Sequence, residues 1–202
     1  MRILLLLLGL AASAGADEAD DYFELGLGYL KTAFYADSRA AFAESLVRAP
    51  GQAVPTAFAA IASAAEGRDS RSCAYLLRLS HQRLPARRTM RIDLRELFRS
   101  AEDLRRVEAR FQLRHDRGRG RTRDNLTILA FLQTQDGSPA TSSALDALLK
   151  RYPDDAFGQS LLKLRPKPPA PKKGPSKAKG NGPGKGTGEK SQAPKGEKPK
   201  KE

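Results

Sequence analysis

The apolar residues of this chain end well before its C-terminus. From residue 165 onward the sequence contains no Leu, Ile, Val, Phe, Tyr or Trp and consists largely of Lys, Pro and Gly. Such a segment has no apolar surface to bury, so nothing offsets the conformational entropy that ordering would remove. We therefore expect residues 165–202 to form a disordered basic tail. The hydrophobic core must come from residues 17–164, which are enough for one modest domain.

Residues 1–16 follow the sequence pattern of a secretory signal peptide. Arg2 supplies one positive charge, a short apolar stretch follows, and Ala14-Gly15-Ala16 forms a small-residue cleavage site. The apolar stretch is far shorter than the roughly 20 residues that span a bilayer. We predict cleavage after Ala16, so that the exported protein begins at Asp17 and is periplasmic or extracellular.

The apolar residues of the body recur with a helical period. Leu104, Val107 and Phe111 are three and four residues apart, which places them on one face of a helix. Ser100 precedes this helix and Asp154 precedes the last one, and both are residue types that cap helix N-termini. Because no segment shows the two-residue alternation of a half-buried strand, the sequence predicts an all-helical body.

Spaced aromatic, small and proline residues mark residues 19–52, namely Tyr22, Leu25, Gly26, Tyr29, Phe42 and Pro50. This spacing resembles the tetratricopeptide repeat, W-x-x-L-G-x-x-Y … A-x-x-x-F … P over about 34 residues. Tyr22 stands in place of Trp, and Ser38 stands where Ala is usual. The resemblance implies a pair of antiparallel helices that cross closely at Gly26, with Pro50 ending the second helix.

The same template fits two later stretches less closely. Residues 122–155 keep apolar residues at most of the spaced positions, and residues 53–86 keep small or apolar ones. Residues 87–121 fit no repeat, and we expect them to form an inserted, arginine-rich helical pair. We therefore predict an all-α, tetratricopeptide-like solenoid of helical hairpins followed by the disordered tail.

Stacked hairpins of the tetratricopeptide family form a concave groove that commonly binds a peptide or helix of another protein. On this resemblance, the groove positions of the first repeat are Phe23, Leu27, Leu30 and Lys31. The sequence leaves open the alternative that Phe23 and Leu27 are ordinary core residues. The resemblance implies a non-catalytic scaffold whose partner is an unidentified protein or peptide.

The net charge of +13 comes from two segments and suggests a second hypothesis. Residues 83–123 contain fourteen Arg and six acidic residues, and residues 165–202 contain twelve basic and three acidic residues, a net charge of +9. These segments could bind anionic envelope polymers or membrane surfaces electrostatically. Residues 117–123 and the tail lack the aromatic side chains that stack on bases, so we do not expect specific nucleic-acid binding.

The sequence contains no spacing typical of a catalytic or metal site. His81 and His115 lie far apart, without a metal-binding motif, and we expect both on solvated helix faces. Cys73, the only cysteine, lies in a helical pattern and is predicted to be a core residue. Asp93 and Glu96 are expected to share a helical face and to form salt bridges with the surrounding Arg91, Arg95 and Arg99. We predict no enzymatic activity, cofactor or metal.

Deleting residues 165–202 tests the expectations for the tail. Because the segment has no residue able to join a core, its removal should leave the melting temperature nearly unchanged. Because it carries a net charge of +9, its removal should weaken adsorption to anionic vesicles at low ionic strength, and the difference should vanish near molar salt. A fall of many degrees in melting temperature would show that the segment packs on the body.

Overall fold

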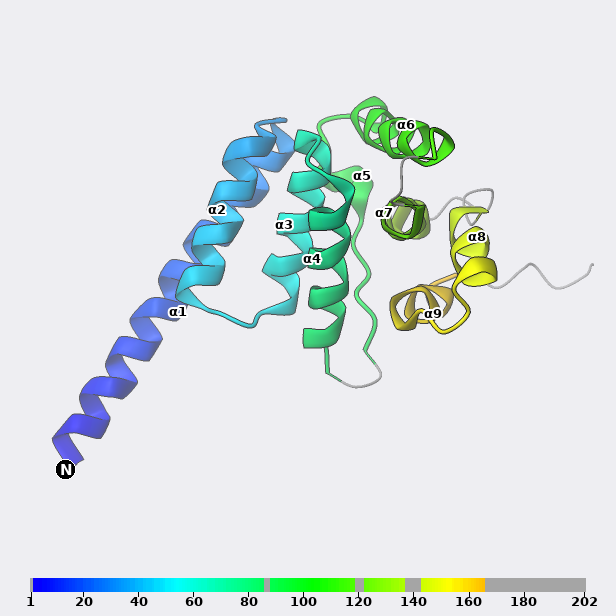
Figure 1. Cartoon of the computed structure of the whole chain (residues 1–202). Coiled ribbons are helices and arrows are strands. Elements are labelled where there is room, and N and C mark those ends of the chain that lie inside the picture. Colours follow the sequence, from blue (N-terminus) through cyan, green and yellow to red (C-terminus); the bar gives the residue numbers. More distant parts are fainter. Residues whose placement is uncertain (1, 86–87, 119–121, 137–142, 166–202) are drawn as a thin grey trace, which may run out of the picture. The chain divides into compact units, whose positions relative to one another are not determined.

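The computed structural model describes residues 2–85, 88–118, 122–136 and 143–165. Within these ranges it contains nine helices and no strand, which confirms the all-helical prediction (Figure 1). The helices are α1 (Arg2–Lys31), α2 (Tyr35–Arg48), α3 (Ala53–Glu66), α4 (Ser70–Arg83), α5 (Leu94–Leu97), α6 (Ala101–Asp116), α7 (Thr122–Asp136), α8 (Ser143–Arg151) and α9 (Ala156–Leu162). The contacts of the chain divide it into residues 1–167 and 168–202, and the first unit alone is described below.

Helix α1 begins before the predicted cleavage site and continues past it. The helix runs without interruption from Arg2 through Ala16 to Lys31. Among the helices that the structure describes, none combines the length and the apolar character required to cross a membrane. Arg165, the first residue of the predicted tail, is described, and its guanidinium pairs with the carboxylate of Asp146 in α8 at 2.9 Å. The other residues of the predicted tail, 166–202, lie outside the described residues.

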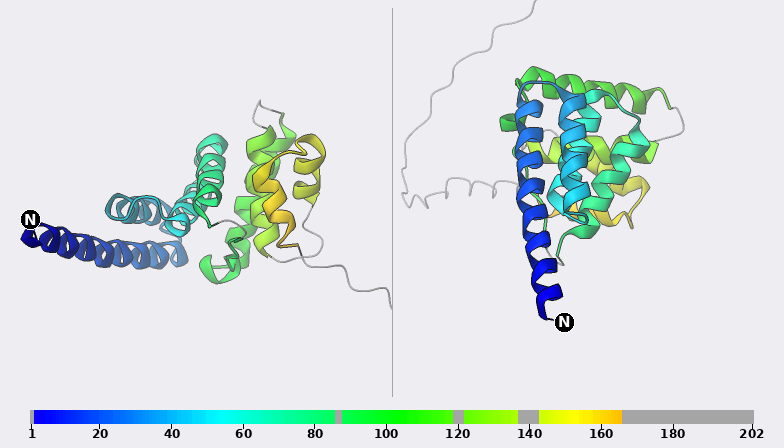
Figure 2. Two further views of the ribbon diagram at one scale, coloured as in Figure 1. Left: turned by 90° about the horizontal axis from the view of Figure 1, so that it is seen from below. Right: turned by 90° about the vertical axis from the view of Figure 1, so that its left-hand side faces the viewer.

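Helices that follow one another in the sequence pack side by side. Helix α2 packs between α1 and α3, and α3 packs on α4; Figure 2 shows α1 and α2 running alongside each other. Helix α4 then packs directly on α7, which packs on α8 and α9. Residues 88–118 therefore leave this series, and their helix α6 packs on α7 and α3 instead.

The first hairpin depends on a close approach of its two helices at Gly26. A Cβ atom at this position would lie 2.6 Å from Cε1 of the Phe42 ring. Close by, the Ser38 hydroxyl donates a hydrogen bond of 2.9 Å to the Gly26 carbonyl oxygen, in a fully buried position. Only a glycine leaves room for this crossing, so the structure places Gly26 where the sequence predicted it.

Helix α3 is the most deeply buried helix among those described. All residues from Pro55 to Ala65 are buried, and most of them are alanine. Small side chains allow neighbouring helices to approach α3 from several sides without voids. Gly67 ends the helix in a left-handed conformation, with φ of 94°, and the space that a side chain would need there is occupied by the guanidinium of Arg110.

The inserted segment differs from the predicted helical pair. Residues 88–93 are irregular, α5 is a single turn, and α6 is the only long helix of the segment. Apolar side chains in and around α5 are buried, and these are Ile92, Leu94, Leu97 and Phe98. Gln135 of α7 holds the irregular residues before α5, because its amide accepts from Ile92 N–H at 2.8 Å and donates to the Met90 carbonyl at 2.9 Å.

The predicted salt bridges within residues 91–99 are wrong. Helix α5 has only four residues, so Arg91 and Arg99 lie outside it. Asp93 instead caps α5 by accepting from Arg95 N–H at 3.0 Å. The Arg95 guanidinium pairs with the carboxylate of Asp136 at the end of α7, at 2.7 Å.

Two helix N-termini test the capping predictions. Ser100 caps α6 as predicted, since its hydroxyl oxygen accepts from Asp103 N–H at 3.1 Å. The cap of α9 is Asp155 and not the predicted Asp154. Asp155 Oδ1 accepts from Gly158 N–H at 2.9 Å, and Oδ2 accepts from the Arg123 guanidinium at 2.7 Å. Asp154 lies exposed one position earlier.

Gly26→Ala should destabilise the protein through overpacking at the Phe42 ring, by about 1–3 kcal/mol, and Gly26→Leu by more. Gly28→Ala is the matched control, because nothing lies within 4 Å of a Cβ at that exposed position. It should stabilise α1 by roughly 1 kcal/mol through helix propensity. Phe42→Leu should recover part of the loss in a double variant. Equal urea midpoints for the two alanine variants would contradict this packing.

Asp155→Asn should lower the free energy of unfolding by about 1–3 kcal/mol at neutral pH, because the buried carboxylate bonds Arg123 and Gly158. Burial tends to raise the pKa of Asp155, but these bonds outweigh burial and the pKa is lowered. The difference in unfolding free energy between wild type and Asp155→Asn should therefore be full well above the ordinary carboxyl pKa of 3.8. It should shrink as the pH falls through the lower folded-state pKa. Urea midpoints of both proteins across this pH range measure the difference. A larger loss for Asp154→Asn would contradict the assigned cap.

Candidate functional site

The structure places most of the predicted groove residues against the chain itself. Leu30 is 0% exposed. The Phe23 ring lies 5.5 Å from the Phe42 ring and 5.3 Å from the Phe58 ring, measured between centroids. Leu27 is partly buried against the same core, and only Lys31 is exposed. The structure thus favours the core alternative for Phe23 and Leu27, and contact of these residues with a partner stays a prediction.

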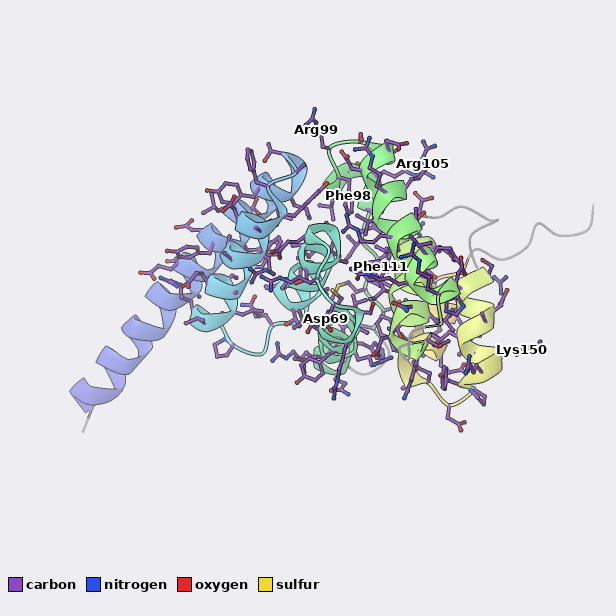
Figure 3. All side chains as sticks on the ribbon, turned by 45° about the horizontal axis from the view of Figure 1, so that its top comes forward. Asp69, Phe98, Arg99, Arg105, Phe111 and Lys150 are labelled. Atoms are coloured by element: carbon purple, nitrogen blue, oxygen red, sulfur yellow. The ribbon has the colours of Figure 1, made fainter. Side chains whose placement is uncertain are left out.

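Several arginines of residues 83–123 are bound within the molecule. Their guanidinium groups contact carboxylates, a threonine hydroxyl or backbone carbonyls, and the residues are Arg83, Arg95, Arg106, Arg110, Arg114 and Arg123. Arg99 and Arg105 instead extend outward (Figure 3). The arginine-rich composition therefore reflects internal contacts as well as surface charge.

A cleft between α4 and α7 is the candidate binding site. It has a volume of about 560 Å³. Two elements that are adjacent in space and distant in sequence form its walls. The lining residues are Arg71, Ser72, Tyr75, Leu76 and Arg78 of α4, and Asp124 of α7. The sequence did not indicate this cleft, because the contact between α4 and α7 depends on residues 88–118 leaving the series.

The sequence of α4 explains which side chains line the cleft. Its buried residues are Ser70, Cys73, Ala74, Leu77 and Ser80, which recur at helical spacing. Arg71 and Tyr75, four residues apart, therefore share the opposite, exposed face. Asp69 caps this helix by accepting from Arg71 N–H and Ser72 N–H.

Cys73 lies on the buried face of α4. Its side chain is 0% exposed, as predicted, and burial raises the pKa of its thiol to about 12. The residue is therefore protonated at neutral pH and has a structural role, since reactivity requires an accessible thiolate.

The wall of the cleft is held by polar contacts between α4 and α7. The Arg78 guanidinium donates to Asp124 Oδ1 at 3.0 Å and to Thr127 Oγ1 at 2.7 Å. Behind it, the buried Ser70 hydroxyl lies 2.5 Å from Asn125 Oδ1 and donates to it. These contacts fix the position of the Arg78 side chain and of the helix that carries Tyr75.

Tyr75 is the most distinctive residue of the cleft. Its side chain is 61% exposed although it stands beside the partly buried Leu76. Tyrosine and arginine are the residue types that most often dominate binding energy at protein interfaces, where a rigid aromatic side chain contacts a partner. The cleft thus offers an aromatic surface, an apolar neighbour and the exposed cation Arg71, on a helix that is already ordered.

No protein-family model matches this chain, and no curated protein or solved structure matches it significantly.

The two histidines lie at the ends of different helices. His81 is at the end of α4 and His115 is at the end of α6. The expectation of a solvated His81 is wrong, because its ring packs edge-on against the Phe157 ring at 5.8 Å and is only partly exposed. Within the described ranges, no three His, Cys, Asp or Glu side chains are grouped so as to hold a metal ion.

Proposed function

We propose that this protein is a non-catalytic scaffold that binds a segment of another protein in the cleft between α4 and α7. The observation that carries the proposal is the exposure of Tyr75 on a helix whose opposite face is fully packed. A partner segment with an apolar side chain would lie on Tyr75 and Leu76. A carboxylate next to that side chain would pair with Arg71.

The architecture supports a tetratricopeptide-like scaffold as part of this proposal. The two helices of each pair α1–α2, α3–α4 and α7–α8 pack directly on each other. These pairs fall in the sequence at the proposed repeats 19–52, 53–86 and 122–155. The crossing of Gly26 with Phe42 and Ser38 has the close packing that the resemblance implies. In this proposal the partner contacts an outer cleft, because Phe23 and Leu30 face neighbouring helices of the chain.

Export is a further part of the proposal. Removal of residues 1–16 would start the mature chain at Asp17, which N-terminal sequencing of protein from the producing cell would detect. The shortened α1 would keep the contacts of its second half, including the salt bridge from Glu18 to Arg48 at 2.8 Å.

Electrostatic binding of an anionic polymer or membrane surface is the second candidate function. The exposure of Arg99 and Arg105 favours it, because these side chains extend outward (Figure 3). The net charge of +9 in residues 165–202 adds to it. Salt distinguishes the two candidates, since long-range charge attraction is screened, whereas apolar contact with Tyr75 persists.

Tyr75→Ala should weaken capture of the protein partner at least ten-fold, because the loss of an interface aromatic commonly costs about 2 kcal/mol or more. Cross-linked pull-downs of the mature full-length protein from its own envelope fraction, washed at high salt, measure the capture. Phe34→Ala is the matched control, since Phe34 is 59% exposed and belongs to the first hairpin. The melting temperatures of both variants should stay close to that of wild type.

The same pull-down can contradict the proposal. Equal capture by wild type and Tyr75→Ala would exclude the cleft as the binding surface. Capture that disappears with salt in every variant would favour the electrostatic alternative. Loss of capture in Arg71→Glu, without a change in melting temperature, would support the predicted acidic side chain of the partner.

A further inference from the structure

A second cavity lies where the end of α4, the irregular residues 88–89 and helix α9 come together. Its volume is about 340 Å³, within the range of sites for small ligands. It is separate from the Tyr75 cleft and shares no lining residue with it. The polar side chains that line it are His81, Arg88, Thr89, Gln159, Ser160 and Lys163.

The charges around this cavity are of one sign. Its cationic or titratable groups are His81, Arg88 and Lys163, and none of the described residues that line it is acidic. The nearby carboxylate of Asp155 is buried and already bonded to Arg123 and to the first turn of α9. The cavity therefore provides cations without an opposing carboxylate in its wall.

A small, mainly apolar recess adjoins the cavity. Its volume is about 20 Å³, and besides Ser80 its lining includes Met90, Phe131, Phe157, Leu161 and Leu164. The recess and the cavity share the lining residues His81, Leu84, Thr89 and Ser160. A ligand in this cavity would meet positive charge at the rim and hydrocarbon below it.

The hydrogen bonds of the lining residues limit which groups can hold a ligand. The Ser160 hydroxyl donates to the Phe157 carbonyl at 2.7 Å, and the Gln159 amide donates to the Pro153 carbonyl at 2.9 Å. The donors left for an anion include the Lys163 ammonium, the Arg88 guanidinium and an imidazole N–H of His81, with the Thr89 hydroxyl beside them. This set suits one small anionic group.

We propose that this cavity binds the carboxylate of an amphiphilic monocarboxylate, with Lys163 and Arg88 contacting the carboxylate and the apolar group lying over the recess. A polyanion would place charge over the apolar recess, and a neutral apolar molecule would gain nothing from the two exposed cations. Two kinds of molecule present this carboxylate beside an apolar group: a free aliphatic acid, and a polypeptide that ends in an apolar residue. The proposal does not depend on the Tyr75 cleft.

His81 provides a site-specific signal for this binding. Burial lowers the pKa of His81, and the charge of Lys163 lowers it further, while Asp155 acts in the opposite direction. Arg88 lines the same cavity and adds positive charge. A bound carboxylate opposes these cations and should raise the pKa of His81. The chain contains two histidines, and His115 lies on α6, so His115 serves as an internal control.

Sodium octanoate, added to the full chain while the histidine rings are observed by ¹H–¹⁵N NMR, tests the proposal. The His81 resonances, assigned with His81→Gln, should move saturably while those of His115 stay nearly unchanged. Lys163→Gln should weaken the apparent affinity roughly ten-fold, the effect of losing one charge-assisted hydrogen bond. Lys150→Gln is the control, because it removes the same charge from an exposed position of α8. The tail contains no histidine, so ions bound by it give no histidine signal of their own.

Two further ligands identify the source of the carboxylate. A short peptide ending in leucine is titrated with a free C-terminus and again as the C-terminal amide. Saturation by the peptide acid at a lower concentration than octanoate indicates a polypeptide terminus, and the reverse order indicates a free aliphatic acid. The proposal is overturned if neither acid moves the His81 resonances. It is also overturned if 1-octanol and the peptide amide act as strongly as the acids, or if Lys163→Gln has no effect.

Discussion

The burial of α3 is the constraint on which the rest of this structure depends. A helix covered from Pro55 to Ala65 cannot leave the carbonyl groups of its last turn to water, so they need donors from the protein. Arg110 donates to the carbonyls of Ala64 and Ala65, at 3.2 and 3.1 Å. Arg114 donates to the carbonyls of the following turn, at 2.7 and 2.9 Å. Both cations also lie at the negative end of the helix dipole, which stabilises them further.

This arrangement gives the inserted segment a structural role. Helix α6 leaves the series of hairpins, but its arginines complete the C-terminus of α3. The irregular residues before it are held by Gln135, whose amide satisfies one backbone donor and one acceptor. A buried segment without regular structure requires such side-chain partners, because its backbone groups otherwise lose their hydrogen bonds to water. The excess of arginine in residues 83–123 is therefore explained in part by internal hydrogen bonding.

Helix α4 connects both proposed surfaces. Its exposed face carries Tyr75 beside α7, and its last turn carries His81 beside α9. The contacts of Arg78 with Asp124 and Thr127 hold the helix against α7. A rigid helix between two open surfaces suits a scaffold, since neither surface has to become ordered when a ligand binds.

Local patterns in the sequence determined the all-helical character, the close crossing at Gly26 and the buried position of Cys73. Each of these depends on residues within one helix or one hairpin. The cap of the last helix shows the limit of local evidence, because Asp154 and Asp155 are equally suitable cap residues. Only Asp155 meets Arg123, which lies in another helix.

The tertiary structure alone decided which side of α1 is buried and which surfaces stay open. Leu25 and Leu30 are both apolar residues near the Gly26 crossing, yet packing buries Leu30 and leaves Leu25 45% exposed. In the same way, the pairing of Arg95 with Asp136 and the cleft beside Tyr75 join residues that are distant in sequence. Such contacts follow from the way helices pack on one another. The spacing of residues within a single helix does not specify this packing.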